Sequence, residues 1–133
     1  MEPTERINAN AAFFKYWLPL IFYCAAIFIQ SSYPSPDIGP EWAYFDKFLH
    51  FLAYAGLGIL FYRAYGTLPI IKNQNVLIFL SILSAALYGA GDELHQSFVS
   101  ARHADGFDFL ADMAGSFCGV LVFRLIRRPT DNS

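Results

Sequence analysis

The residues best suited to chemistry are acids and a histidine that occur in pairs one helical turn apart. Asp46 and His50 are four positions apart, and so are Asp108 and Asp112. This spacing places both members of a pair on one face of a helix. A carboxylate next to a histidine can relay a proton, serve as a general base or hold a metal ion. The other polar candidates for ligand binding are Lys47, Tyr54, Asp92, Glu93, His95, Gln96 and Arg102.

Several kinds of chemistry are open to this set. His50, Asp108 and Asp112 are the candidates for acid–base or nucleophilic catalysis. Arg102 has the planar donor fork that suits phosphate or carboxylate, and Lys47 can add a point charge. The acids and histidines are acceptable metal ligands, but no tight motif such as H-E-x-x-H occurs, so a metal or other cofactor stays an open question. The alternative without chemistry is a hydrogen-bonded network that only locks helices together.

The composition shows what kind of chain carries these residues. It has 133 residues, of which 56% are hydrophobic, 18% aromatic and 15% charged, whereas soluble domains have about 25% charged residues. This balance, with a net charge of −2, excludes a disordered chain, a collagen-like fibre and a basic nucleic-acid-binding protein. A soluble four-helix bundle would need polar helix faces, and the first apolar stretch has almost none. We expect an integral membrane protein.

Four apolar stretches predict four membrane-spanning helices in one all-α domain, residues 1–133. Each stretch is shorter than the ~20 residues that a spanning helix needs, so polar neighbours must extend it. The segment before the first stretch has few positive charges and no Ala-x-Ala site follows, which favours a retained span over a cleaved signal peptide. The expected four-helix bundle has helices over 15–33, 46–65, 73–93 and 106–127.

The distribution of charge predicts the orientation. With the N-terminus inside, the cytoplasmic segments hold seven of the nine Lys and Arg residues, so both termini should be cytoplasmic. Helix rise then places His50 and Asp112 at a similar depth, roughly 10 Å below the outer surface. An ionisable group at that depth costs about 2.5–3.5 kcal/mol and must face the bundle interior or a water-filled crevice. We therefore expect one polar site that opens outward.

Small residues predict which helices pack closely. Ala111, Gly115 and Gly119 recur every four residues in the fourth helix, a pattern that allows close approach of two helix backbones. Ala55, Gly56 and Gly58 play a similar part in the second helix. Both helices also begin with Phe-Asp followed by a second polar residue four positions later, which is compatible with a duplicated helical hairpin. Close packing of these two helices would bring the two Asp-bearing faces together.

Three motifs occur in order along the chain. They are Asp46-Lys47-x-x-His50-Phe51-x-x-Tyr54, Asp92-Glu93-x-His95-Gln96-x-Phe98 and Arg102-x5-Asp108-x3-Asp112-x2-Gly115. In this order they resemble the VanZ-like family of small bacterial membrane proteins. The chain departs from the family pattern twice: Ser100-Ala101 stands where the family usually has Pro-Gly, and Asp112 stands where it often has Asn. The additional carboxylate bears on which ligand the site prefers.

The resemblance implies a multi-pass protein of the cell (inner) membrane, part of the cell envelope, with the three motifs forming the functional site. The founding member of the family is associated with resistance to the glycopeptide antibiotic teicoplanin. We expect membrane lipids as partners and binding of an anionic lipid-linked or cell-wall precursor group at the outward-facing site. An oligomer is compatible with four short spans but is not predicted by any motif.

Two alternative functions follow from the same residues. One is a membrane enzyme that hydrolyses or transfers a phosphoryl or acyl group on a lipid. Arg102-x5-Asp108-x3-Asp112 also resembles the third motif of the phosphatidic-acid-phosphatase superfamily, with Asp108 at the nucleophile position, but the other two motifs of that superfamily are missing. The other alternative is an ion conduit, which is disfavoured because the inner half of the predicted spans has no acidic residue.

Overall fold

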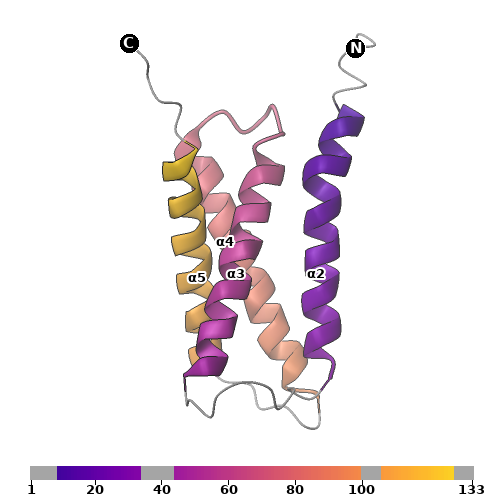
Figure 1. Cartoon of the computed structure of the whole chain (residues 1–133), viewed down its shortest axis with the longest axis vertical. Helices are drawn as coiled ribbons and strands as arrows, with labels where there is room; N and C mark the ends of the chain where they lie inside the picture. The colour runs from indigo at the N-terminus through magenta and orange to yellow at the C-terminus, as the bar shows by residue number, and fades with distance from the viewer. Residues whose placement is uncertain (1–8, 34–43, 100–105, 128–133) are drawn as a thin grey trace.

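The computed structural model describes residues 9–33, 44–99 and 106–127, and every regular element in these ranges is helical. The helices stand side by side along the long axis of the molecule and alternate in direction (Figure 1). This architecture confirms the predicted all-α bundle. In chain order the elements are the π-helical segment η1 (Phe13–Trp17), α2 (Leu18–Ser31), α3 (Phe45–Tyr65), α4 (Gln74–Gln96) and α5 (Gly106–Ile126).

Three of the helices are long and apolar enough to cross a membrane. They are Ala9–Ser31, which includes η1 and α2, together with Gln74–Gln96 and Gly106–Ile126. The 21 residues of α3 give it a similar length, but Asp46, Lys47 and Arg63 make it more polar. Because α3 contacts η1, α2, α4 and α5, its polar groups can face protein instead of lipid. Thus α3 is the centre of the bundle.

The helix ends differ from those predicted from the sequence. The first helix begins at Ala9 rather than at 15, because the run of Ala and Phe before Lys15 continues the helix. Within it, the N–H of Leu18 donates to the carbonyl of Phe13, the wider spacing of a π turn. Pro19 follows at once and has no N–H to offer the turn before it, so the irregular turn lies where the regular hydrogen-bond ladder is interrupted.

The helix α4 continues to Gln96, beyond the predicted end at 93. Its start is fixed by Asn73, whose side chain accepts hydrogen bonds from the N–H groups of Asn75 and Val76, a standard N-cap. The additional turn at the other end brings His95 and Gln96 onto the helix. As a result, the polar residues of the second motif, from Asp92 to Gln96, lie on one helix, and Phe98 follows it.

The close approach of α3 and α5 that the small residues predict is present. A Cβ atom on Gly119 would lie 2.5 Å from the carbonyl oxygen of Ala55, and one on Gly58 would lie 3.0 Å from that of Ser116. Gly115 lies even more tightly against the backbone of Phe51. Larger side chains at these positions would hold the helices apart. This crossing fixes the first turn of α3 against the first turns of α5.

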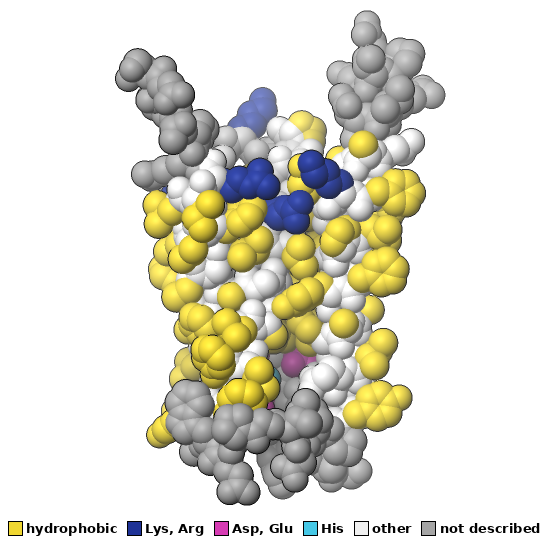
Figure 2. Space-filling model, viewed as in Figure 1, with side chains coloured by type: hydrophobic (Ala, Val, Ile, Leu, Met, Phe, Trp, Pro, Cys, Tyr) yellow, Lys and Arg dark blue, Asp and Glu magenta, His cyan; other side chains and the backbone are white. Residues whose placement is uncertain are grey.

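Charge is segregated along the bundle axis. Lys and Arg side chains gather at one end of the visible face, and acidic side chains lie in the opposite half (Figure 2). The start of the first helix and the end of α5 lie at the basic end (Figure 1). The positive-inside rule predicts that the end rich in Lys and Arg faces the cytoplasm. The cytoplasmic position of both termini stays a prediction.

Candidate functional site

His50 lies between the two aspartates of α5. Its Nδ1 is 2.8 Å from Oδ1 of Asp112, and its Nε2 is 3.7 Å from Oδ2 of Asp108. Asp112 is fully buried and Asp108 is 4% exposed. The two pairs spaced by four residues, one on α3 and one on α5, therefore meet across the helix crossing as the sequence predicts.

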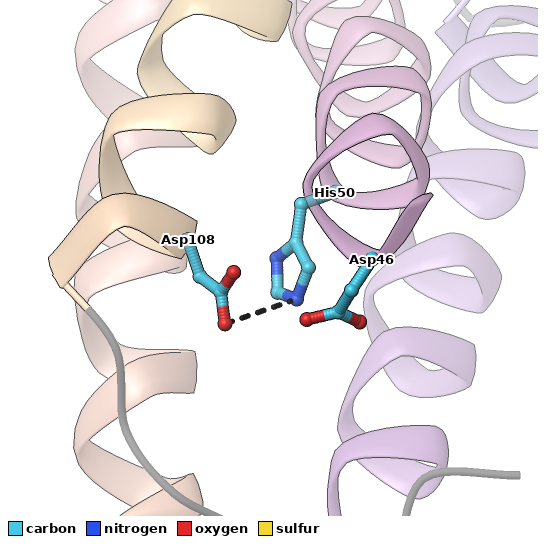
Figure 3. A group of neighbouring side chains, drawn as sticks. All are labelled: Asp46, His50 and Asp108. Carbon is cyan, nitrogen blue, oxygen red and sulfur yellow. Dashed lines mark ion pairs between the residues drawn. The ribbon is translucent and has the colours of Figure 1, made fainter. Parts of the chain in front are cut away.

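Lys47 and Asp46 complete the outer part of this group. The Nζ of Lys47 is 2.9 Å from Oδ1 of Asp108, an ion pair between α3 and α5. Asp46 is exposed, and its carboxylate points toward His50 and Asp108 (Figure 3). Because Lys47 and His50 both face Asp108, the charge of this carboxylate is compensated by groups on the neighbouring helix.

Glu93 reaches the same place from α4. The ligand atoms of His50, Glu93 and Asp112 all lie within 4.8 Å of one another. Gly89, one turn earlier on α4, makes room: a Cβ there would lie 2.9 Å from Oδ2 of Asp112 and 3.1 Å from the Tyr54 ring. We call these residues from three helices the carboxylate–histidine cluster: Asp46, Lys47, His50, Glu93, Asp108 and Asp112.

Two parts of the cluster have the composition of a metal site. Asp46, His50 and Asp108 form one group, and His50, Glu93 and Asp112 form the other. A mixture of imidazole and carboxylate ligands suits Zn²⁺ or Mn²⁺ better than the soft ion Cu(I), which prefers sulfur ligands. In the first group Lys47 already supplies a positive charge to Asp108. The second group is more deeply buried: Glu93 and Asp112 are both buried, whereas Asp46 of the first group is exposed.

Asp92 serves a different purpose from Glu93. It accepts hydrogen bonds from Ser31 of α2, from Tyr54 of α3 at 3.3 Å and from Gln96 of α4 at 3.4 Å. Gln96 also donates to Ser31, at 3.1 Å. All four residues are buried, so this network joins α2, α3 and α4 beside the cluster. Ser31 was not among the predicted site residues, because a serine at the end of an apolar stretch has no distinctive spacing.

His95 does not join the cluster. Its Nε2 lies 3.0 Å from Oγ of Ser32, and its ring stacks on Phe28 with the centroids 4.8 Å apart. The side chains of Glu93 and His95 leave α4 in different directions because residues two apart on a helix do not share a face. Arg102, the predicted anion-binding residue, lies outside the described residues.

A cavity of about 410 Å³ opens beside the cluster between α2 and α3. Figure 2 shows a hollow in the acidic half with acidic side chains inside it. The lining combines apolar side chains of α2 and α3 with polar groups of the cluster and of the Asp92 network. The sequence predicts a polar site that opens outward, but not the size or the lining of this cavity, because these depend on how α2 packs. Its lining is Tyr23, Ala26, Ile27, Gln30, Asp46, Leu49, His50, Ala53, Tyr54 and Asp92.

Apolar helices of spanning length around a buried acid–histidine cluster define a polytopic helical membrane protein. The family comparison agrees with this class. The model of the VanZ/LLP1 family matches residues 4–127, nearly the whole chain, so the protein belongs to that family. No curated protein and no solved structure gave a match.

Proposed function

We propose that this protein lies in the cell (inner) membrane and binds an anionic lipid-linked group, a cell-wall precursor in particular, in the cavity between α2 and α3. The observation that carries the proposal is the mixed lining of this cavity, which has both apolar and polar side chains. Ala26, Ile27, Leu49 and Ala53 offer apolar contacts to a lipid chain. His50, Asp46 and Asp92 lie on the same cavity and offer polar contacts to a headgroup.

The charge of the cluster limits how an anion is held. The cluster contains four carboxylates against Lys47 and His50, and Asp92 lies beside it. A phosphate therefore needs additional positive charge, which is the role we propose for Arg102. Asp46, Glu93, Asp108 and Asp112 would then act as hydrogen-bond acceptors that set the position of His50 and Lys47, and they would favour a headgroup that also carries donors such as sugar hydroxyls.

A change in cavity volume tests the proposal. Ala26 is exposed and lines the cavity, whereas its neighbour Ala25 is exposed and does not. We expect Ala26→Trp to fill the cavity and to reduce retention of co-purified lipid by about tenfold, or about 1.4 kcal/mol. Ala25→Trp adds the same ring on another face of α2 and should retain lipid. The measurement is native mass spectrometry of the purified protein.

Arg102→Ala tests the headgroup separately. The variant should still bind neutral lipid but lose its preference for anionic lipid-linked species. If Ala26→Trp and Ala25→Trp retain lipid equally, the cavity is not the binding site. If Arg102→Ala keeps the preference for anionic species, the role proposed for Arg102 is wrong.

The link to teicoplanin is tested separately. The measurement is the teicoplanin susceptibility of cells that express the wild type, Ala26→Trp or Ala25→Trp.

A second candidate function is lipid hydrolysis or group transfer. The observation that favours it is the position of His50, which lines the cavity and lies between Asp112 at Nδ1 and Asp108 at Nε2. A carboxylate that orients a histidine in this way is a common feature of general-base catalysis. Purified protein should then turn over a labelled lipid phosphate or ester, and His50→Ala should abolish the turnover. Absence of turnover across a broad lipid panel would leave binding as the function.

A further inference from the structure

A second cavity, of about 340 Å³, lies at the end of the bundle opposite the carboxylate–histidine cluster. It is framed by η1, by the last turn of α3, by the first turn of α4 and by the end of α5. Figure 2 shows that Lys and Arg side chains gather at this end. The lining residues that matter below are Tyr16, Tyr62, Arg63, Gln74, Phe123 and Arg127.

Two arginines from different helices line this cavity. The guanidinium of Arg63 lies 5.1 Å from the ring centroid of Tyr16, and that of Arg127 lies 5.3 Å from the centroid of Phe123. Each is thus held against an aromatic ring, a contact that orients the guanidinium. The Nε of Arg63 is buried and has no hydrogen-bond partner among the described residues. A buried donor without an acceptor is unfavourable unless a ligand or water supplies one.

The rest of the cavity agrees with an anionic ligand. The acids of the described ranges, Asp46, Asp92, Glu93, Asp108 and Asp112, all belong to the opposite end of the bundle. The hydroxyl of Tyr62 donates to Oε1 of Gln74 at 3.0 Å, which leaves the NH₂ group of Gln74 as a donor. The cavity therefore combines two guanidinium groups and an amide donor with aromatic and aliphatic side chains.

We propose that this cavity binds a phosphate-bearing anion. Arginine pairs recognise phosphate oxygens through bidentate hydrogen bonds. The phosphate could belong to an anionic phospholipid of the adjacent leaflet or to a soluble phosphate compound, and both share this chemistry. Phe123 and Leu77, which also line the cavity, would contact the glycerol part of a lipid headgroup. The site is separate from the cavity between α2 and α3 and does not depend on the function proposed for that cavity.

The test uses the full-length protein in nanodiscs that contain phosphatidylcholine with or without phosphatidylglycerol. Native mass spectrometry counts the phosphatidylglycerol molecules that stay bound. Arg63→Gln and Arg127→Gln should each weaken retention by about fivefold to tenfold. Lys72→Gln is the matched control, because Lys72 is a cation at the same end that does not line this cavity. Thermal unfolding of each variant in phosphatidylcholine alone verifies that it is folded.

Competition separates the two sources of phosphate. If inorganic phosphate or glycerol 3-phosphate at millimolar concentration displaces phosphatidylglycerol from the wild type but not from the arginine variants, the cavity binds the phosphate of a soluble compound. If neither compound competes, the cavity binds a lipid headgroup. Equal losses in Lys72→Gln and the arginine variants would mean general surface attraction and would overturn the proposal. Unchanged retention in both arginine variants would also overturn it. Ala26→Trp, which alters only the other cavity, should have no effect in this assay.

Discussion

Asp112 is a fully buried carboxylate whose hydrogen bond to His50 compensates only one of its two oxygens; Oδ2 has no hydrogen-bond partner among the described residues. A buried acid of this kind is costly unless it is paired. His50 supplies the pair on one side, and Gly89 provides the space on the other. The pair can therefore serve stability, function or both, and the two roles can be separated by mutation.

The first prediction concerns this pair. We expect His50→Leu to lower the free energy of unfolding by about 3–5 kcal/mol, because it leaves Asp112 buried without its partner. His50→Leu combined with Asp112→Leu should recover most of this loss, since two apolar side chains replace the pair. Thermal and denaturant unfolding in detergent give the values. The double variant should be folded yet fail to retain lipid; if it retains lipid normally, the pair only stabilises the bundle.

The second prediction concerns Ser31, the residue of α2 that binds Asp92. Ser31→Ala removes a donor to a buried carboxylate and an acceptor of Gln96, and we expect a loss of about 1–3 kcal/mol in unfolding free energy. Ser97→Ala is the control. Its hydroxyl is exposed and bonds only to the carbonyl of Leu94 in its own turn, so its effect should stay within about 0.5 kcal/mol. Equal effects of the two changes would contradict the importance of the Asp92 network.

Among the helices, the α3–α5 crossing determines whether the cluster forms. The Gly and Ala spacing on both helices was enough to predict this contact, because only small residues let two backbones come so close. The crossing leaves His50 one residue before the Phe51 backbone on which Gly115 packs. The geometry of the site is therefore a direct result of small residues that take no part in its chemistry.

The third prediction follows from this crossing. Gly119→Ala should destabilise the protein by about 3 kcal/mol, because a Cβ at this position would lie 2.5 Å from the backbone oxygen of Ala55. Gly91→Ala is the matched control on α4, where no atom lies within 4 Å of the added carbon. This change should be neutral or stabilising by up to about 1 kcal/mol. Similar losses for both variants would show that the backbone contact is not limiting.

Other features of the helices could not be predicted from the sequence. The composition and the apolar stretches identified the number and type of the helices, but their ends depend on contacts made after folding. For example, α4 reaches Gln96 because that side chain is buried against Ser31 and Asp92. The size of the cavity could not be predicted either, because it depends on the distance between α2 and α3. Tyr23, which donates to the carbonyl of Ala53, links the two helices without any recognisable motif.

For the molecule as a whole, the main prediction is its orientation in the membrane. In a background of Cys24→Ala and Cys118→Ala, a cysteine that replaces exposed Ser97 should react with a membrane-impermeant maleimide added to intact cells. A cysteine that replaces exposed Lys72, at the other end of the bundle, should react only after the membrane is permeabilised. The positive-inside distribution of Lys and Arg is the reason. The reverse labelling pattern would contradict an outward-facing cluster.

The separation of basic and acidic side chains toward opposite ends of the bundle also has an electrical consequence. In the predicted orientation, it gives the molecule a dipole moment along the membrane normal. With the basic end in the cytoplasm, as predicted, this dipole would be aligned with an inside-negative membrane voltage. Each charge that crosses the full field contributes about 2.3 kcal/mol per 100 mV. In the predicted orientation, the voltage would therefore disfavour insertion of the bundle upside down.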